Sequence, residues 1–141
     1  MALLFEREGV SFRYPESWRL EREESAGGWT VSLQSPGTAF LTLTFEEGMP
    51  EVEAMADAAL AALREVYPDL EVENRVEQFA GQMAVGHDMT FISLDLTNTC
   101  WTRSFYSDIG TLLLLCQCSD FELEQYGLVL KAICASLRVE E

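Results

Sequence analysis

The feature that most constrains this chain is a series of short segments in which apolar and polar residues alternate, with clusters of turn residues between them. Residues 29–33 and 41–45 carry large apolar side chains at every second position, and the segment 35–38 between them is Ser-Pro-Gly-Thr. A period of two places the apolar side chains on one face of a β-strand. Two such strands separated by a short turn predict a β-hairpin.

Further strands follow from the same pattern. We predict strands over residues 10–14, 18–23, 29–33, 41–45, 70–77, 83–97, 100–107 and 111–119. In the long segment 83–97 the apolar alternation shifts phase at Phe91–Ile92, which predicts a β-bulge there. Residues 112–115 are all leucine, so both faces of that strand are apolar, and we expect it at the centre of a sheet that is covered on both sides.

Two segments change to a helical period. From Pro50 to Tyr67 the apolar residues recur every three or four positions, Pro50 suits the first helical position, and Pro68 ends the helix. Near the C-terminus, Ser119–Glu122 matches a capping box, in which the serine hydroxyl and the glutamate carboxylate each accept a hydrogen bond from a free backbone N–H. We therefore expect a second helix that begins at this box and extends to Leu137.

This order of elements predicts an α+β fold. Hairpin connections dominate and no strand–helix–strand alternation is present, so we expect a mainly antiparallel sheet of about seven strands packed with two main helices. No linker, repeat or low-complexity tract divides the sequence, and 141 residues suffice for a real hydrophobic core. We therefore expect a single domain over residues 1–141.

The charge of the chain excludes several classes of partner. Twenty-four acidic residues against nine basic ones give a net charge of −15. Such a surface repels phosphate backbones and anionic lipid headgroups, so we expect no nucleic-acid binding and no membrane docking. The apolar run at residues 2–5 is shorter than the roughly 7–15 residues of a secretory signal, and no segment reaches the roughly 20 residues of a membrane span. We expect a soluble, cytoplasmic protein.

Histidine chemistry has one candidate residue. His87 is the sole histidine, and its neighbour Asp88 would point to the opposite face of the strand, so the two cannot pair directly. None of the common motifs of hydrolases, zinc proteases or nucleotide-binding loops is present. We expect His87 to lie at the surface or at a strand edge, and we predict no catalytic residue.

The four cysteines lie in apolar or patterned segments, at Cys100, Cys116, Cys118 and Cys134. A reducing compartment and an adequate core favour free, buried thiols over disulfides. One residue lies between Cys116 and Cys118, whereas structural zinc sites usually have two to four residues between paired cysteines. We expect no metal and no cofactor. Two alternatives stay open because they depend on positions in space: a pairing of His87 with one of the thiols, and a zinc site at the thiols.

A candidate partner-binding surface comes from aromatic residues. Trp101, Arg103 and Phe105 share one face of a predicted strand, and Phe40 points away from the main apolar face of its own strand. Tryptophan, arginine and phenylalanine are enriched at the cores of protein interfaces. We therefore predict that these four residues bind a partner if they are exposed. The competing interpretation is that the second helix covers them.

One short motif resembles a known family. Phe12, Tyr14, Pro15 and Trp18 form an aromatic-x-aromatic-Pro-x-x-Trp pattern similar to the opening of PsbP/Mog-like domains, and the order of predicted elements fits that family as well. The resemblance implies an αβα sandwich built on a mainly antiparallel sheet. It also implies a binding protein and not an enzyme, since the family includes photosystem extrinsic subunits, Ran-binding Mog proteins, bacterial lipoproteins and type VI secretion effector chaperones.

Two functions remain after these exclusions. The first is a small non-catalytic protein-binding module, a chaperone or adaptor for another bacterial protein, which could also form a homodimer. The second is a small-ligand-binding protein or an enzyme that uses a pocket between sheet and helix with His87 or a cysteine. The positions of the imidazole and the thiols in space distinguish the two.

Overall fold

A computed structural model describes residues 2–140, and its elements are as follows. They are β1 (Ala2–Arg7), β2 (Val10–Pro15), β3 (Arg19–Ser25), β4 (Gly28–Gln34), β5 (Phe40–Glu46), α1 (Val52–Val66), β6 (Glu71–Phe79), β7 (Gln82–Ser93), β8 (Leu96–Tyr106), β9 (Thr111–Ser119), a 3-10 turn (Asp120–Glu122), a π-helical turn (Leu123–Gly127), α2 (Leu128–Ser136) and β10 (Arg138–Val139).

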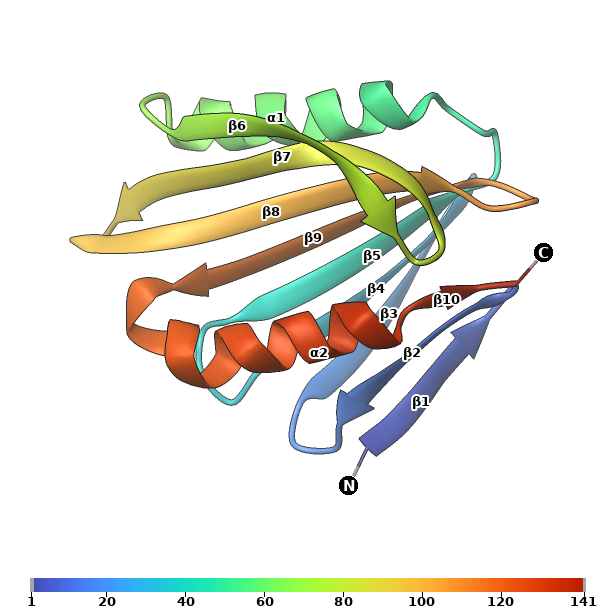
Figure 1. Cartoon of the computed structure of the whole chain (residues 1–141), viewed down its shortest axis with the longest axis horizontal. Coiled ribbons are helices and arrows are strands. Elements are labelled where there is room, and N and C mark those ends of the chain that lie inside the picture. The colour runs from blue at the N-terminus through green and yellow to red at the C-terminus, as the bar shows by residue number, and fades with distance from the viewer. Residues whose placement is uncertain (1, 141) are drawn as a thin grey trace.

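The main sheet has seven strands in the order β3-β4-β5-β9-β8-β7-β6, and every neighbouring pair is antiparallel. The helices α1 and α2 pack on opposite faces of this sheet (Figure 1). A small three-stranded sheet, β1-β2-β10, adds to the α2 side. The α+β fold with a mainly antiparallel sheet and two helices is confirmed.

Two hydrophobic clusters explain why β9 is apolar on both faces. On the α2 side, Leu114 and Cys116 belong to the larger cluster together with Leu130 of α2. On the α1 side, Leu115 packs against the smaller cluster, which contains Met89 and other residues of β6 to β8. The prediction that this strand is central and covered on both sides is confirmed.

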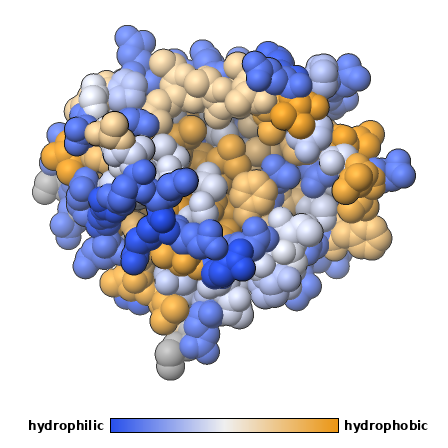
Figure 2. Space-filling model, turned by 180° about the vertical axis from the view of Figure 1, so that it is seen from behind, coloured by the Kyte–Doolittle hydropathy of each residue, from blue (hydrophilic) through white to orange (hydrophobic). Residues whose placement is uncertain are grey.

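The face opposite to α2 is only partly covered. Within residues 2–140, helix α1 packs against β7, β8 and β9 and makes no comparable contact with β3, β4 or β5. Seen from this side, apolar side chains gather in a hollow bordered by hydrophilic residues (Figure 2). By register, Phe40, Leu113 and Leu115 lie on this face, and all three are half-buried.

The long strand predicted over residues 83–97 is two strands. Leu94 and Asp95 form a tight turn with φ angles of 52° and 63°, and β7 and β8 pair directly up to it. The predicted bulge is wrong, because Phe91 lies opposite Asn98 and Ile92 opposite Thr97 in unbroken register. The apolar alternation shifts because Ile92 lies exposed near the end of the hairpin, at 71%.

The predicted capping box is also wrong. Ser119 makes no side-chain hydrogen bond to the turn that follows it. The Glu122 carboxylate instead accepts hydrogen bonds from the backbone N–H of Thr38, at 3.1 Å, and from its hydroxyl, at 2.5 Å. A loop 84 residues away therefore competes for the carboxylate, and the regular helix α2 begins only at Leu128.

Three smaller differences concern the ends of elements. Helix α1 begins at Val52 after the N-cap Glu51, so Pro50 precedes the helix and is not its first residue. Strand β1 was not predicted, and it pairs with β2 through a turn in which Glu8 and Gly9 have positive φ angles. The short strand β10 was not predicted either, and it pairs with β2 on the other side.

Candidate binding groove

A groove of about 580 Å³ runs between α2 and the strands β6, β7 and β8. We call it the α2 groove. Its floor includes Trp101 and Arg103 of β8 and Asp88 of β7, and Leu128 and Cys134 contribute from the helix side. Asp88 lies opposite Trp101 in the β7–β8 register, and side chains two residues apart on a strand share a face. The sheet register therefore places these polar and aromatic groups on one wall.

A network of charges fixes Arg103 at the floor of the α2 groove. Its side chain is only 7% exposed, and its Nε lies 2.7 Å from Glu77 while one Nη lies 3.0 Å from Asp88. The same Nη donates to the carbonyl oxygen of Thr102 at 2.7 Å. Asp88 also binds Arg75, and this hydrogen bond raises the pKa of the Arg75 guanidinium. Two carboxylates neutralise Arg103, so its charge is not free to bind an anion.

Exposed apolar side chains form the rim of the α2 groove. Leu128, at the start of α2, is 64% exposed, and Leu123 in the π-helical turn is 37% exposed. Exposed apolar side chains that gather beside a groove are typical of interaction sites.

The π-helical turn Leu123–Gly127 shapes the end of the α2 groove. Such turns are rare and occur frequently at functional sites. Gly127 is buried, and a Cβ at this position would approach Leu123 to 3.3 Å, so the glycine allows Leu123 to fold back beside it. Both residues line the groove.

The structure separates the four residues predicted to bind a partner. Trp101, half-buried, and Arg103 both line the α2 groove. Phe105 is fully buried in the main core, where its ring lies 5.5 Å from that of Phe79. Phe40 lies on the opposite face of the sheet, in a shallow depression beside Arg19. Only two of the four predicted residues are thus brought together at an accessible site.

His87 is buried beneath α1, so the prediction of a surface or strand-edge histidine is wrong. It is 7% exposed, and its Nε2 lies 3.6 Å from the Asp57 carboxylate. Its Nδ1 is buried without a hydrogen-bond partner among the described residues. Asp88 faces the α2 groove on the other side of the sheet, as the alternation along the strand predicts.

The cysteines are free and lie on both sides of the sheet. The cluster on the α2 side includes or contacts three of them, Cys116, Cys118 and Cys134. Cys100 lies in the cluster under α1, on the same face of the sheet as His87. Burial raises the pKa of the Cys100 thiol to about 12, which leaves it protonated at neutral pH. A nucleophilic pair of Cys100 with His87 therefore has no thiolate to use.

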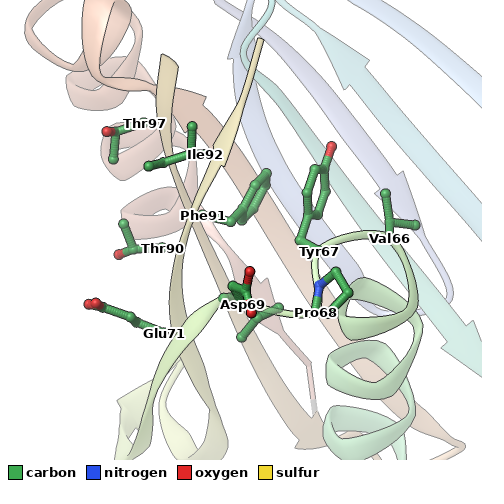
Figure 3. A pocket seen from close by; sticks show the side chains of 10 residues that line it. Val66, Tyr67, Pro68, Asp69, Glu71, Thr90, Phe91, Ile92 and Thr97 are labelled. Carbon is green, nitrogen blue, oxygen red and sulfur yellow. The ribbon is translucent and has the colours of Figure 1, made fainter. Parts of the chain in front are cut away.

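A second pocket of about 460 Å³ lies where α1 ends (Figure 3). The rings of Tyr67 and Phe91 stack within it, with centroids 4.0 Å apart. Strand β6 begins at Glu71, opposite Thr90, so β7 continues past its partner here and leaves the pocket open. Its charged lining residues are two carboxylates, Asp69 and Glu71, and it contains no buried cation comparable to Arg103. The α2 groove is larger, at about 580 Å³, and it brings together two of the four residues predicted to bind a partner, so it is the stronger candidate.

Two features are absent from the described residues: a cluster of possible metal ligands and a helix that could span a membrane. Within residues 2–140, no group of three or more histidine, cysteine, aspartate or glutamate side chains is arranged to hold a metal ion. No helix in this part of the chain is both long enough and apolar enough to span a bilayer.

Comparison with known proteins identifies the fold. The sequence matches no protein-family model and no curated protein. The solution structure of cyanobacterial PsbP (CyanoP) from Synechocystis is similar, with a TM-score of 0.67 at 10% identity over 99% of this chain and 92% of that one. LpqN, which is involved in cell envelope biogenesis in Mycobacterium tuberculosis, gives a TM-score of 0.54 at 14% identity over 94% of this chain and 83% of LpqN.

A Bacteroides thetaiotaomicron protein gives a TM-score of 0.61 at 10% identity over 94% of this chain. This chain spans only 46% of that protein's length. At such identities the likeness establishes the architecture alone, since one fold can carry unrelated functions. The chain therefore has the PsbP-like fold that the resemblance of the Phe12–Trp18 segment implied.

Proposed function

We propose that this chain is a non-catalytic binding module that holds an apolar segment of another protein in the α2 groove. The observation that carries the proposal is the combination of a preformed aromatic floor with an exposed leucine rim. Trp101 and Arg103 are held in place by packing and ion pairs, so their side chains lose little freedom on binding. Leu128 and Leu123 offer apolar area that water would leave on complex formation.

The charge of the chain supports a partner with basic flanks. A net charge of −15 attracts cationic proteins at long range and speeds their encounter with the groove. The buried core of the contact would be apolar, and the basic residues of the partner would lie around it. We place this module in the cytoplasm, as a chaperone or adaptor for its partner.

The alternative of an enzyme with a Cys–His site has less support from the geometry. His87 faces Asp57 and α1, whereas Cys134 lies in the α2 groove on the other side of the sheet. The thiol on the histidine side, Cys100, is protonated at neutral pH because burial raises its pKa to about 12. If His87 nevertheless held a ligand, the change in thermal stability that the ligand causes would disappear in H87A.

A matched pair of variants tests the proposal. Leu128→Glu places a carboxylate on the rim of the α2 groove, and Val66→Glu places one at a similarly exposed position at the end of α1, 64% against 66%. Each variant, tagged, is used to capture partners from the native host, and the bound proteins are quantified by mass spectrometry. We expect one partner to bind the wild type and V66E equally and to be lost from L128E. Equal retention by the two variants, or no partner at all, would refute the groove as the binding site.

Self-association is measured on the same proteins. Sedimentation velocity of the wild type, L128E and V66E distinguishes a foreign partner from a second copy of the chain. A dimer that persists in L128E forms through another surface. A dimer lost only in L128E would show that the groove binds this chain itself.

A further inference from the structure

Two thiols from different elements meet beside the α2 groove. Cys116 on β9 and Cys134 on α2 have their sulfur atoms 3.8 Å apart. Cys116 is completely buried, whereas Cys134 is half-buried and lines the groove. A solvent-borne reagent can therefore reach Cys134 but not Cys116.

We propose that Cys134 is an oxidation site and that Cys116 is its resolving cysteine, so that a peroxide converts the pair into a disulfide joining β9 to α2. The proposal goes beyond the binding function and does not depend on it, because neither a partner nor an occupied groove is needed for the reaction.

The surroundings of the two sulfurs make Cys134 the residue that reacts with peroxide and Cys116 the residue that resolves the product. A hydrogen bond from the Cys116 thiol lowers the pKa of Cys134 and outweighs the opposing effect of burial, and the Trp101 side chain and the Arg103 charge lower it further. Burial and the same hydrogen bond raise the pKa of Cys116. The thiolate form, which reacts with peroxides, is thus favoured at the accessible residue.

The other two cysteines are poor competitors. Burial raises the pKa of Cys118 to about 11, with Glu122 and Asp120 adding to the effect, and burial raises the pKa of Cys100 to about 12. Cys118 is also 1% exposed and Cys100 fully buried. Of the four cysteines, Cys134 alone combines a partly exposed position in the groove wall with a lowered pKa.

The reaction balances in two steps, with hydrogen peroxide as oxidant. The Cys134 thiolate attacks one peroxide oxygen, the O–O bond breaks, and the released hydroxide takes up a proton to leave as water, which gives Cys134 sulfenic acid. The Cys116 sulfur then attacks the Cys134 sulfur, its S–H proton moves to the leaving hydroxyl, and a second water departs as the S–S bond forms. The peroxide gains the two electrons that the thiols lose, and a dithiol reductant reverses the change.

The geometry requires only a short movement. A disulfide is about 2.05 Å long, so the two sulfurs must approach by about 1.8 Å from their separation of 3.8 Å. Rotation about the Cα–Cβ bond of Cys134, together with a small shift of α2, provides this approach. The chain before α2 is a 3-10 turn and a π-helical turn, so the helix is not a rigid continuation of β9.

Peptide mapping tests the proposal directly. Trypsin cleaves after Arg103, Lys131 and Arg138, so Cys116 falls in peptide 104–131 and Cys134 in peptide 132–138. The native protein is treated with hydrogen peroxide near neutral pH, free thiols are blocked, and the digest is analysed by mass spectrometry. We expect one cross-linked pair, 104–131 with 132–138, that disappears on reduction. In native alkylation without peroxide, we expect Cys134 to react at least about tenfold faster than Cys118.

Variants assign the sulfurs, because Cys116 and Cys118 share a peptide. The cross-link should persist in C118S and disappear in both C116S and C134S. In C116S the Cys134 sulfenic acid should accumulate and react with dimedone. Far-UV circular dichroism of each variant is compared with that of the wild type to check that the variant is folded. The peptide map of the wild type tests the proposal even if a variant does not fold. A cross-link that survives in C116S, a wild-type Cys134 that is oxidised without any cross-link, or a Cys134 that stays reduced under peroxide would overturn the proposal.

Discussion

Replacing Gly86 with alanine should destabilise the protein severely, because the backbone of the neighbouring strand β8 leaves no room for a Cβ at this residue. A Cβ at Gly86 would lie 1.8 Å from the carbonyl oxygen of Thr102 and 3.2 Å from the Cα of Arg103. Real Cβ atoms essentially never come within 3.0 Å of such an atom, so the β8 backbone would have to retreat by about 1.2 Å. Both strands lie inside the seven-stranded sheet, where their other neighbours resist such a movement.

The magnitude follows from overpacking in a rigid core. Inserting a methyl group into a packed site typically costs about 1–3 kcal/mol, and a clash with backbone belongs at the upper end of that range. We expect G86A to lower the free energy of unfolding by about 3 kcal/mol, which corresponds to a fall of about 10 °C in Tm for a domain of this size. The displaced Thr102–Arg103 backbone should also weaken partner retention in the α2 groove.

Urea denaturation followed by circular dichroism measures this effect, with Gly48→Ala as the matched control. Gly48 has no neighbouring atom within 4 Å of an added Cβ, and its φ angle is not in the left-handed region. G48A should therefore leave stability unchanged or raise it by about 0.5 kcal/mol, through a less flexible unfolded chain. A G86A protein within about 0.5 kcal/mol of the wild type would refute the close packing of β7 on β8.

Two further predictions concern side-chain partners. Glu122→Ala should lower the free energy of unfolding by about 1–2 kcal/mol, since the carboxylate anchors the loop at Thr38. Ser119→Ala should change it by less than about 0.5 kcal/mol, because this side chain makes no capping hydrogen bond. Urea titrations of both variants measure the two changes, and a larger effect of Ser119→Ala would contradict the structure. The hydrogen bond from Arg7 lowers the pKa of Glu24, so its stabilising effect is fully present above pH 4.5, the ordinary pKa, and is lost as the pH falls through the lowered value. Glu24→Gln should therefore have a lower urea midpoint than the wild type at neutral pH and the same midpoint in acid, and a difference that does not shrink below pH 4.5 would contradict this.

The sequence predicted the parts of the fold that depend on local periodicity. Alternation identified β4 and β5, and the run of leucines at residues 112–115 identified the central strand, because both patterns report which faces are buried. The hairpin turn at Leu94–Asp95 escaped prediction because it contains neither glycine nor asparagine, although two residues there have positive φ angles. The contact between Glu122 and Thr38 could not be predicted, because the two residues lie far apart in the sequence and no local pattern links them.

The candidate site could be predicted only in part, for the same reason. Strand alternation places Trp101 and Arg103 on one face, and the structure shows that they share the α2 groove. It also places Phe105 on that face, but whether a residue lies under a helix or beside it depends on where α2 crosses the sheet. The pairing of Cys116 with Cys134 likewise arises from tertiary packing, since the two residues lie 18 positions apart along the chain.

The three-stranded sheet has a consequence for synthesis of the protein. The middle strand, β2, can pair with β1 as soon as both have been synthesised. Its other neighbour is β10, near the C-terminus. Just after β10, the backbone N–H of Glu140 donates to the carbonyl oxygen of Gly9 at 2.7 Å. On the ribosome, the edge of β2 must therefore stay open until residues 138–140 emerge. A nascent chain that stops earlier would expose an unsatisfied edge, and such edges mark incomplete chains for aggregation or for quality-control factors.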